Sequence, residues 1–217
     1  MKKTIIVLIL LSTLPVFGQT HFIGVKGGLN LTNNTAGNMF HPDTYRAGFT
    51  GGLSYDYIFK NNINIGVALL YAQKGNKLDL NLTDQYGNSL GNNLVINYNY
   101  DYISLPIKAG YSIGDKLKGV LNLGVVPSLS VSAKTVAHGF KDNSLIGLDL
   151  NDQISKFDFG ALIEVGGSYK LNQKFLLVAS IDLQKSFTNF IKDPFFPDHR
   201  LTHYGVTFSA GLKYALK

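Results

Sequence analysis

The segment HYGVTFSAGLKYAL, residues 203–216, alternates apolar residues with polar or small ones along its whole length. One face of an extended chain would carry Tyr204, Val206, Phe208, Ala210, Leu212 and Tyr214. The other face would carry His203, Gly205, Thr207, Ser209, Gly211 and Lys213. Because successive side chains of a strand point to opposite faces, this period of two predicts a β-strand with one apolar face.

The same alternation recurs through the chain after residue 19 and predicts eight strands in all. The other seven lie near residues 22–31, 45–58, 63–81, 103–111, 121–131, 157–168 and 175–186. Their connections alternate between short turns and long loops, and the long loops cover residues 32–44, 82–97, 133–156 and 188–201. A meander with one tight end and one long-looped end is typical of outer-membrane barrels.

The composition excludes several classes of protein. The chain has 217 residues and no cysteine, so a disulfide scaffold, a thiolate metal site and a lipid anchor on cysteine are ruled out. Only 16% of the residues are charged, whereas an ordinary soluble domain has roughly 25%. Together with 12 tyrosines and 14 phenylalanines, this balance argues against a disordered chain.

The alternation is compatible with two kinds of barrel. One is a soluble, lipocalin-like barrel with its apolar face inside, and the other is a membrane barrel with that face against lipid. Glycine crowds the polar face, at Gly24, Gly28, Gly48, Gly52, Gly66, Gly110, Gly124, Gly160, Gly166, Gly205 and Gly211. Small residues suit the narrow interior of an eight-stranded barrel, whereas on a solvated surface they would weaken the strands. Tyrosines gather near strand ends, as in bilayer girdles, at Tyr55, Tyr57, Tyr71, Tyr98, Tyr100, Tyr102, Tyr111, Tyr169, Tyr204 and Tyr214. We therefore predict an all-β fold, an eight-stranded antiparallel up-and-down transmembrane β-barrel.

The first eighteen residues have the organisation of an export signal. Two lysines precede an apolar run over residues 5–11, and residues 16–18 offer a cleavage site before Gln19. The apolar run is well short of the ~20 residues that a membrane-spanning helix needs. We therefore predict a cleaved signal peptide over residues 1–18, a single barrel domain over residues 19–217, and export to the cell outer membrane.

One strand also resembles a known family. The stretch DYISLPIKAGY, residues 101–111, is similar to the "YLEIPLLLKY"-type strand of the PorT-like family of outer-membrane β-barrel proteins. Supporting matches are IGVKGGLNLT (23–32), GVALLYAQKGNK (66–77) and FSAGLKYAL (208–216). The resemblance implies one eight-stranded barrel in the outer membrane of a Gram-negative cell. One branch of that family acts in protein secretion and gliding motility, and this chain departs from the usual barrel ending because it closes on Leu216-Lys217 instead of an aromatic residue.

Charged residues alternate onto the polar face, which places them in the lumen. By strand parity, the inward set comprises Lys26, Arg46, Asp56, Lys108, Glu164, Asp182 and Lys213, together with Lys74 and Asp158. Buried charges must be paired, because an unpaired one costs several kcal/mol. We predict a salt-bridge network that fills the lumen. The alternative is a narrow porin-like channel for small solutes, which eight strands disfavour because they leave no aqueous pore.

The sequence offers weak signals for catalysis. His199 and His203 have a spacing that binds zinc on a helix, but they fall at a junction between loop and strand. His203 with Ser186 and Asp182 could form the site of a lipid-modifying enzyme, which stays a further alternative. We find no nucleophile elbow and no phosphate-binding loop, so we predict no catalytic, cofactor-binding or metal site.

Two surfaces suggest partners. Phe195 and Phe196 stand between prolines in the last long loop and form a candidate contact surface, unless they fold onto the barrel mouth or into lipid. The short-turn side is basic, with Lys60, Lys116, Lys118, Lys170, Lys174 and Lys217 against Asp115. The long loops show no basic track for nucleic acid. We predict a structural or interaction role, with outer-membrane lipid and a periplasmic or surface protein as partners.

Overall fold

The computed structural model describes residues 20–35, 44–138, 146–192 and 200–216. The proposed signal peptide, Phe195, Phe196 and His199 lie outside the described residues. Within them, no helix is long and apolar enough to cross a membrane.

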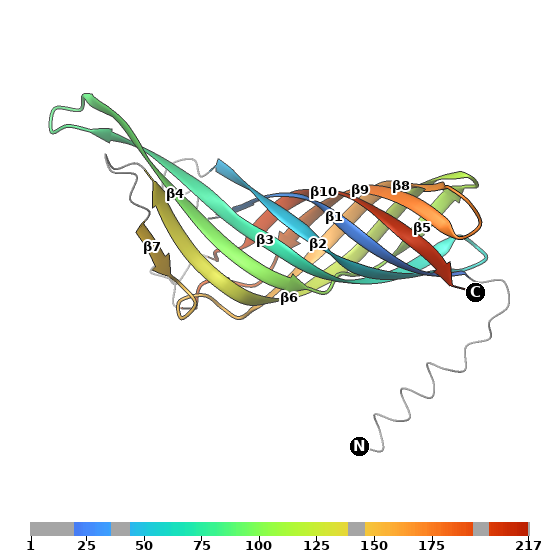
Figure 1. Ribbon diagram of the computed structural model, residues 1–217. Helices are drawn as coiled ribbons and strands as arrows, with labels where there is room; N and C mark the ends of the chain where they lie inside the picture. The colour runs from blue at the N-terminus through green and yellow to red at the C-terminus, as the bar shows by residue number, and fades with distance from the viewer. Residues whose placement is uncertain (1–19, 36–43, 139–145, 193–199, 217) are drawn as a thin grey trace, which may run out of the picture.

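In the described part of the chain, ten strands make up one antiparallel sheet (Figure 1). They are β1 (Thr20–Asn34), β2 (Thr44–Ile58), β3 (Ile63–Thr83), β4 (Ser89–Ser104), β5 (Ile107–Gly114), β6 (Leu117–His138), β7 (Ile146–Asp149), β8 (Phe157–Lys170), β9 (Phe175–Ser186) and β10 (His203–Leu216). The first strand pairs with the last, from His21 opposite Leu216 to Asn34 opposite His203, so the sheet closes on itself.

The closed ring has eight strand positions, as the sequence predicts. Strands β4 and β5 share one position, because both pair with β3 on one side and with β6 on the other. The break between them falls at Leu105 and Pro106. Proline has no N–H for the ladder, and here its carbonyl accepts from Ala68 N at 3.0 Å while Leu105 N bonds across to Pro127 O at 2.8 Å. Strand β7 lies off the ring and pairs with β6 alone.

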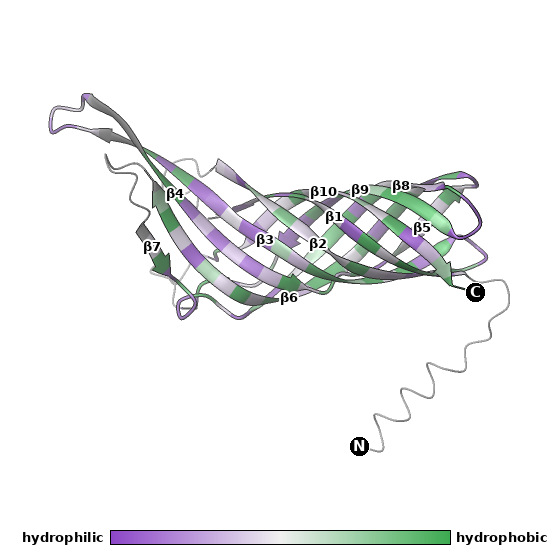
Figure 2. Cartoon of the chain, in the orientation of Figure 1, coloured by the Kyte–Doolittle hydropathy of each residue, from purple (hydrophilic) through white to green (hydrophobic). Residues whose placement is uncertain are grey.

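The two faces of the wall differ as predicted for a membrane barrel. The outer face is apolar: Leu53 is 62% exposed, Leu123 60% and Phe49 56%. Apolar bands alternate with polar residues along each strand (Figure 2). The inner face carries buried polar and charged side chains, among them Asp158 and Asn122. The apolar face therefore lies against lipid and the polar face against the lumen.

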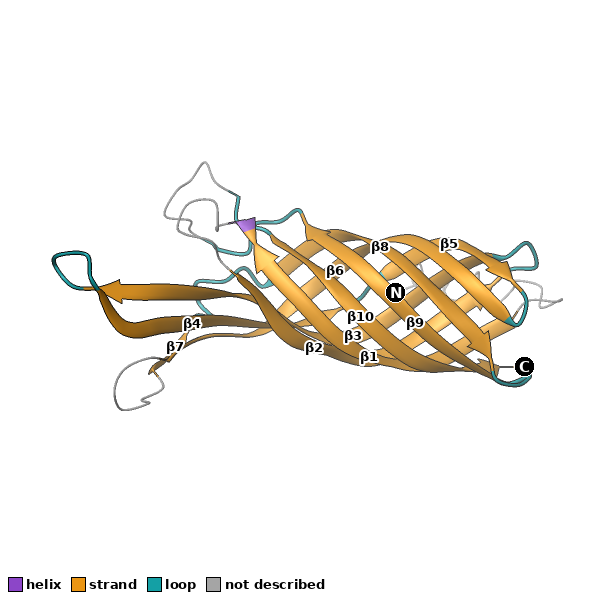
Figure 3. Cartoon of the chain, turned by 90° about the horizontal axis from the view of Figure 1, so that it is seen from above, coloured by secondary structure: helices purple, strands orange, loops and turns teal. Residues whose placement is uncertain are grey.

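The wall is much taller on one side. Strands β3, β4 and β6 have 21, 16 and 22 residues, whereas β9 has 12. A tilted strand crosses a membrane in about 9–11 residues. The three long strands therefore continue beyond the membrane, with β7 added at the β6 edge, and form an arm that projects from one end of the barrel (Figures 1 and 3).

This arm corrects two of the predicted long loops. Residues 89–97 belong to β4, and residues 133–138 belong to β6, so the predicted loops 82–97 and 133–156 are wrong in those parts. The β3–β4 connection is a tight turn in which Asp84 Oδ1 accepts from the backbone N of Tyr86 and of Asn88, both at 2.9 Å. Gly87 supplies the positive φ of 85° that the turn needs. The asparagines around this turn suggested a loop, yet the hydrogen-bonded ladder continues through them.

Inward-facing glycines are required where neighbouring strands approach closely. An added Cβ at Gly28 would lie 2.0 Å from the backbone O of Phe208, and one at Gly52 would lie 2.0 Å from the backbone O of Leu69. At these positions a larger side chain is therefore excluded by the backbone of the next strand, and not only by the small volume of the lumen. Gly27, which faces outward, has its nearest such atom, Thr50 O, at 3.6 Å.

We expect Gly28→Ala to lower the free energy of unfolding by about 1–3 kcal/mol, because its Cβ would force β1 and β10 apart. Gly27→Ala in the same strand is the matched control and should change stability by less than about 0.5 kcal/mol. Urea unfolding in lipid vesicles, read by gel mobility without boiling, measures both. Equal losses in the two variants would contradict the packing argument.

Candidate functional site in the barrel lumen

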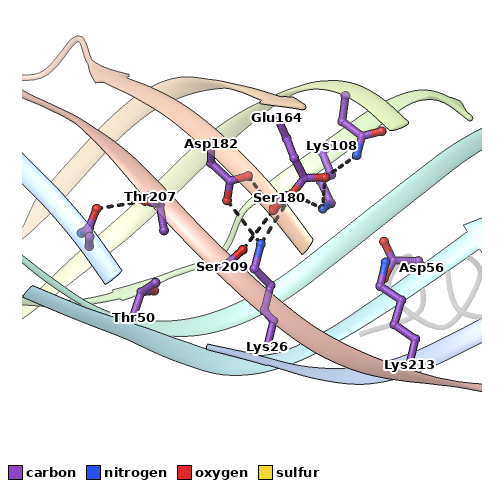
Figure 4. Close-up of polar contacts among 12 residues, drawn as sticks. Lys26, Thr50, Asp56, Lys108, Glu164, Ser180, Asp182, Thr207, Ser209 and Lys213 are labelled. Atoms are coloured by element: carbon purple, nitrogen blue, oxygen red, sulfur yellow. Dashed lines mark hydrogen bonds and ion pairs between the residues drawn. The ribbon is translucent and has the colours of Figure 1, made fainter. Parts of the chain in front are cut away.

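A cluster of four charged side chains crosses the middle of the lumen (Figure 4). Lys108 Nζ from β5 lies 2.6 and 2.7 Å from the two carboxylate oxygens of Glu164 on β8. Lys26 Nζ from β1 lies 3.5 Å from Glu164 and 3.3 Å from Asp182 on β9. Asn122 donates a further hydrogen bond to Glu164. The ion pairs therefore join strands that are not neighbours in the ring.

Two more ion pairs lie on either side of this cluster. Toward the short turns, Lys213 Nζ lies 2.8 Å from Asp56 Oδ2. Toward the arm, Lys74 Nζ lies 2.8 Å from Asp158 Oδ2 and 4.8 Å from the centre of the Tyr102 ring. Asp158 also accepts from the hydroxyls of Ser186 and Thr188, each at 2.9 Å. The lumen thus holds three layers of paired charges.

Arg46 stands apart from these layers. Its Nη1 donates to the backbone O of Lys74 at 3.1 Å, at the place where the β2–β3 register shifts between Tyr45 and Thr50. Of the seven residues predicted for the network, the structure therefore places six in ion pairs. The seventh, Arg46, bonds to a backbone carbonyl where the pairing of β2 with β3 is irregular.

The end of the lumen nearest the arm is closed by aromatic side chains. Tyr102 is fully buried, and Phe190 and His203 are each 2% exposed. Phe190 stacks on His203 with ring centres 4.2 Å apart, and Tyr102 Oη lies 3.3 Å from His203 Nε2. Tyr100, Ala133 and Ile154 complete this buried cluster, which we call the aromatic plug.

The aromatic plug corrects part of the predicted tyrosine girdle. Tyr100 and Tyr102 face the lumen, with 3% and no exposure, instead of lipid. The sequence could have shown this. Tyr100 and Tyr102 are even-numbered, whereas the outward-facing Ile103 and Leu105 of the same segment are odd-numbered, so the two tyrosines belong to the inward face. Phe190 was missed altogether, since it lies between strands, where no alternation marks it.

The residues considered for lipid-modifying chemistry do not meet. Ser186 Oγ donates to Asp158, Asp182 pairs with Lys26 and accepts from Ser180, and the His203 ring packs within the aromatic plug. A nucleophile, base and acid must instead be linked in series. Within the described residues, no group of three His, Asp or Glu side chains is arranged to hold a metal ion.

The closed ring, lipid-facing apolar wall and charge-filled lumen define a small outer-membrane-type β-barrel. The family model "Outer membrane protein beta-barrel domain" matches residues 17–192. The chain belongs to this family, and membership places it in the outer membrane.

Solved barrels resemble it in fold. A major outer membrane protein from Thermus thermophilus is 12% identical, with 92% of this chain and 100% of that chain covered and a TM-score of 0.55. The attachment invasion locus protein Ail of Yersinia pestis is 13% identical, with 92% and 100% covered and a TM-score of 0.46. OprG from Pseudomonas aeruginosa is 14% identical, with 92% and 96% covered and a TM-score of 0.44. A comparison with curated protein sequences gave no match.

We expect Glu164→Gln to destabilise the barrel by about 3–5 kcal/mol, because it leaves Lys108 buried without a carboxylate. Adding Lys108→Met to that variant should recover part of the loss, with a coupling free energy of about 1–3 kcal/mol. Urea unfolding of the wild type, the two single variants and the double variant gives the coupling free energy of this double-mutant cycle.

The exposed pair Lys77–Asp79, 3.5 Å apart with both side chains 38% exposed, is the control. Its double-mutant cycle should give about 0–1 kcal/mol. Equal coupling in the two cycles would mean that the lumen pair contributes no more than a surface pair.

Proposed function

We propose that this protein is a non-conducting outer-membrane barrel that presents its arm at the cell surface for interaction with a partner. The observation that carries the proposal is the height of the wall formed by β3, β4 and β6. Residues beyond the lipid-facing band are not needed to cross the bilayer. The short turns at the other end match the periplasmic side of outer-membrane barrels, which supports an extracellular arm.

The arm has one face suited to contact. On β3, Leu78 and Leu80 continue the inward parity of Lys74, and they pair with Ile96 and Leu94 of β4. These leucines and their partners are half-buried. On β7, Leu148 is 60% exposed, and it lies opposite Thr135 of β6. Large apolar side chains gathered outside the membrane are typical of interaction surfaces.

The contents of the lumen argue against the channel alternative. A solute path would have to separate three layers of buried ion pairs and displace the aromatic plug. Breaking one buried pair costs about 3–5 kcal/mol, which opposes a steady conducting state.

The resemblance of residues 101–111 to the PorT-like strand supports a narrower family and a Gram-negative source, and the basic short-turn side supports a periplasmic partner. We include these points in the proposal. We assign the protein no reaction, since the contacts of His203, Ser186 and Asp182 are made to other side chains.

The purified barrel in a planar bilayer should pass no steady current above that of the lipid alone. Discrete, long-lived conductance steps would instead establish the channel alternative.

The arm is tested by shortening it. Lys77 and Asn97 are paired across the β3–β4 ladder, so residues 78–96 can be replaced by a two-residue Asn-Gly turn. We expect the shortened barrel to keep its heat-dependent gel shift. On intact cells, a membrane-impermeant amine cross-linker should give a higher-mass adduct with the full chain and no adduct with the shortened chain. An adduct of equal yield in both would contradict a role for the arm.

A further inference from the structure

The periplasmic half of the lumen contains space that the ion pairs do not fill. A cavity of about 70 Å³ lies between the central charge cluster and the short turns. A water molecule needs about 10–15 Å³ of such volume, so this space can hold several waters or a few atoms of a ligand. It leads into a wider mouth of about 490 Å³, and Phe22, Ile58 and Leu176 line both spaces. The cavity is therefore open toward the periplasm, while the aromatic plug closes the opposite end.

Two polar atoms in the cavity wall lack a hydrogen-bond partner among the described residues. They are Nδ2 of Asn64 and Oδ1 of Asn122, on side chains that are 5% and 2% exposed. The orientation of Asn122 follows from its contact, because a carboxylate accepts only and Glu164 must take the amide N–H. Leaving a buried polar group unpaired is unfavourable, because the group has lost its hydrogen bonds to water. These atoms favour an occupant that offers both a donor and an acceptor.

The charge of the cavity changes with depth. Three of the four lysines that line the inner cavity, Lys26, Lys108 and Lys213, are paired with carboxylates, and the fourth, Lys118, also lines the mouth. At the mouth, three lysines face a single carboxylate: the lining holds Lys116, Lys118, Lys170 and Asp115. A concave site with an excess of one charge attracts ions of the opposite sign. The mouth therefore favours an anion.

The wall shared by the mouth and the inner cavity is mostly apolar, with Phe22, Ile58 and Leu176 beside Ser168 and Lys118. Phe22 and Leu176 are buried there, at 6% and 8% exposure, and Ile58, Val120 and Val178 add aliphatic surface. An occupant that reaches from the mouth lysines to Asn64 and Asn122 must pass these side chains. Small-molecule sites commonly have such a pattern, with mostly apolar walls and a few convergent polar groups.

From this pattern we infer that the periplasmic half of the lumen binds a small amphipathic anion, a carboxylate or phosphate ester with a short apolar chain. The anionic head lies at Lys118 and Lys170, and the chain packs between Phe22 and Leu176. Its distal end, or water carried with it, reaches Asn64 and Asn122. This inference does not depend on the role proposed for the arm.

The test uses the full mature chain in lipid nanodiscs and isothermal titration calorimetry. The probes are hexanoate, hexyl phosphate, inorganic phosphate and hexanol. We expect saturable binding of one or both six-carbon anions, at least tenfold weaker binding of inorganic phosphate, and at least tenfold weaker binding of hexanol. The comparison of hexanoate with hexyl phosphate identifies the head group.

The variant Lys118→Gln/Lys170→Gln should weaken anion binding at least tenfold. The control Lys60→Gln/Lys174→Gln removes the same charge at the same end of the barrel, from lysines that do not line the cavity or its mouth. It should bind as the wild type does. Val120→Phe, which fills the inner cavity, should abolish binding, provided the heat-dependent gel shift shows that it folds.

Three results would overturn the inference. They are no saturable binding of either six-carbon anion, equal weakening in the two lysine variants, and inorganic phosphate or hexanol binding as tightly as the six-carbon anions. Because the lysine variants change three exposed positions and the half-buried Lys118, the test stands even if Val120→Phe does not fold.

Discussion

Closure of the hydrogen-bond ring is the constraint on which the rest of this structure depends. Lipid offers no partner for a backbone N–H or C=O, so a sheet in a membrane can leave no edge unpaired. Here β1 meets β10 along almost their entire length. Closure with eight positions fixes a narrow interior. Charged side chains that face inward must then find partners across the lumen, as Lys108 does with Glu164, and some inward positions tolerate no side chain, as at Gly28.

The arm shows that the sheet can have open edges where it extends beyond the lipid. Tyr71, Ile103, Leu129 and Phe157 are neighbours across β3, β4, β6 and β8, and β8 begins at Phe157, so beyond this row β6 continues toward the arm without it. Above them the ring is no longer needed, because water can satisfy an open edge. The outer face changes in step, since Lys77 forms an exposed ion pair with its neighbour two residues on. The same hydrogen-bonded strands thus form a closed barrel on the short-turn side of this row and an open sheet in the arm.

The sequence was sufficient for the barrel and for most of its interior because both follow from parity. Phe208 and Leu212 fall on the lipid side and Lys213 on the lumen side by alternation alone. The partners of each charge could not be predicted, because pairing across the lumen depends on strand tilt and register. Part of the arm was missed because asparagine and glycine are frequent in residues 81–93, as they are in a loop. Phe190 was missed because it closes the lumen from a connecting segment.

The three layers of ion pairs differ in their contact with solvent, so the two ends of the lumen are not equivalent. The Lys213 side chain is 19% exposed, Lys26 12%, and Lys74 7% with its partner Asp158 at 1%. Solvent contact of the paired lysines therefore falls from the short-turn end of the lumen to the end closed by the aromatic plug. Coulomb attraction strengthens as water is excluded, so the pair beneath the aromatic plug resists separation most. At the other end, Lys213 keeps the most solvent contact of the three lysines, beside the cavity that lies between the central cluster and the short turns.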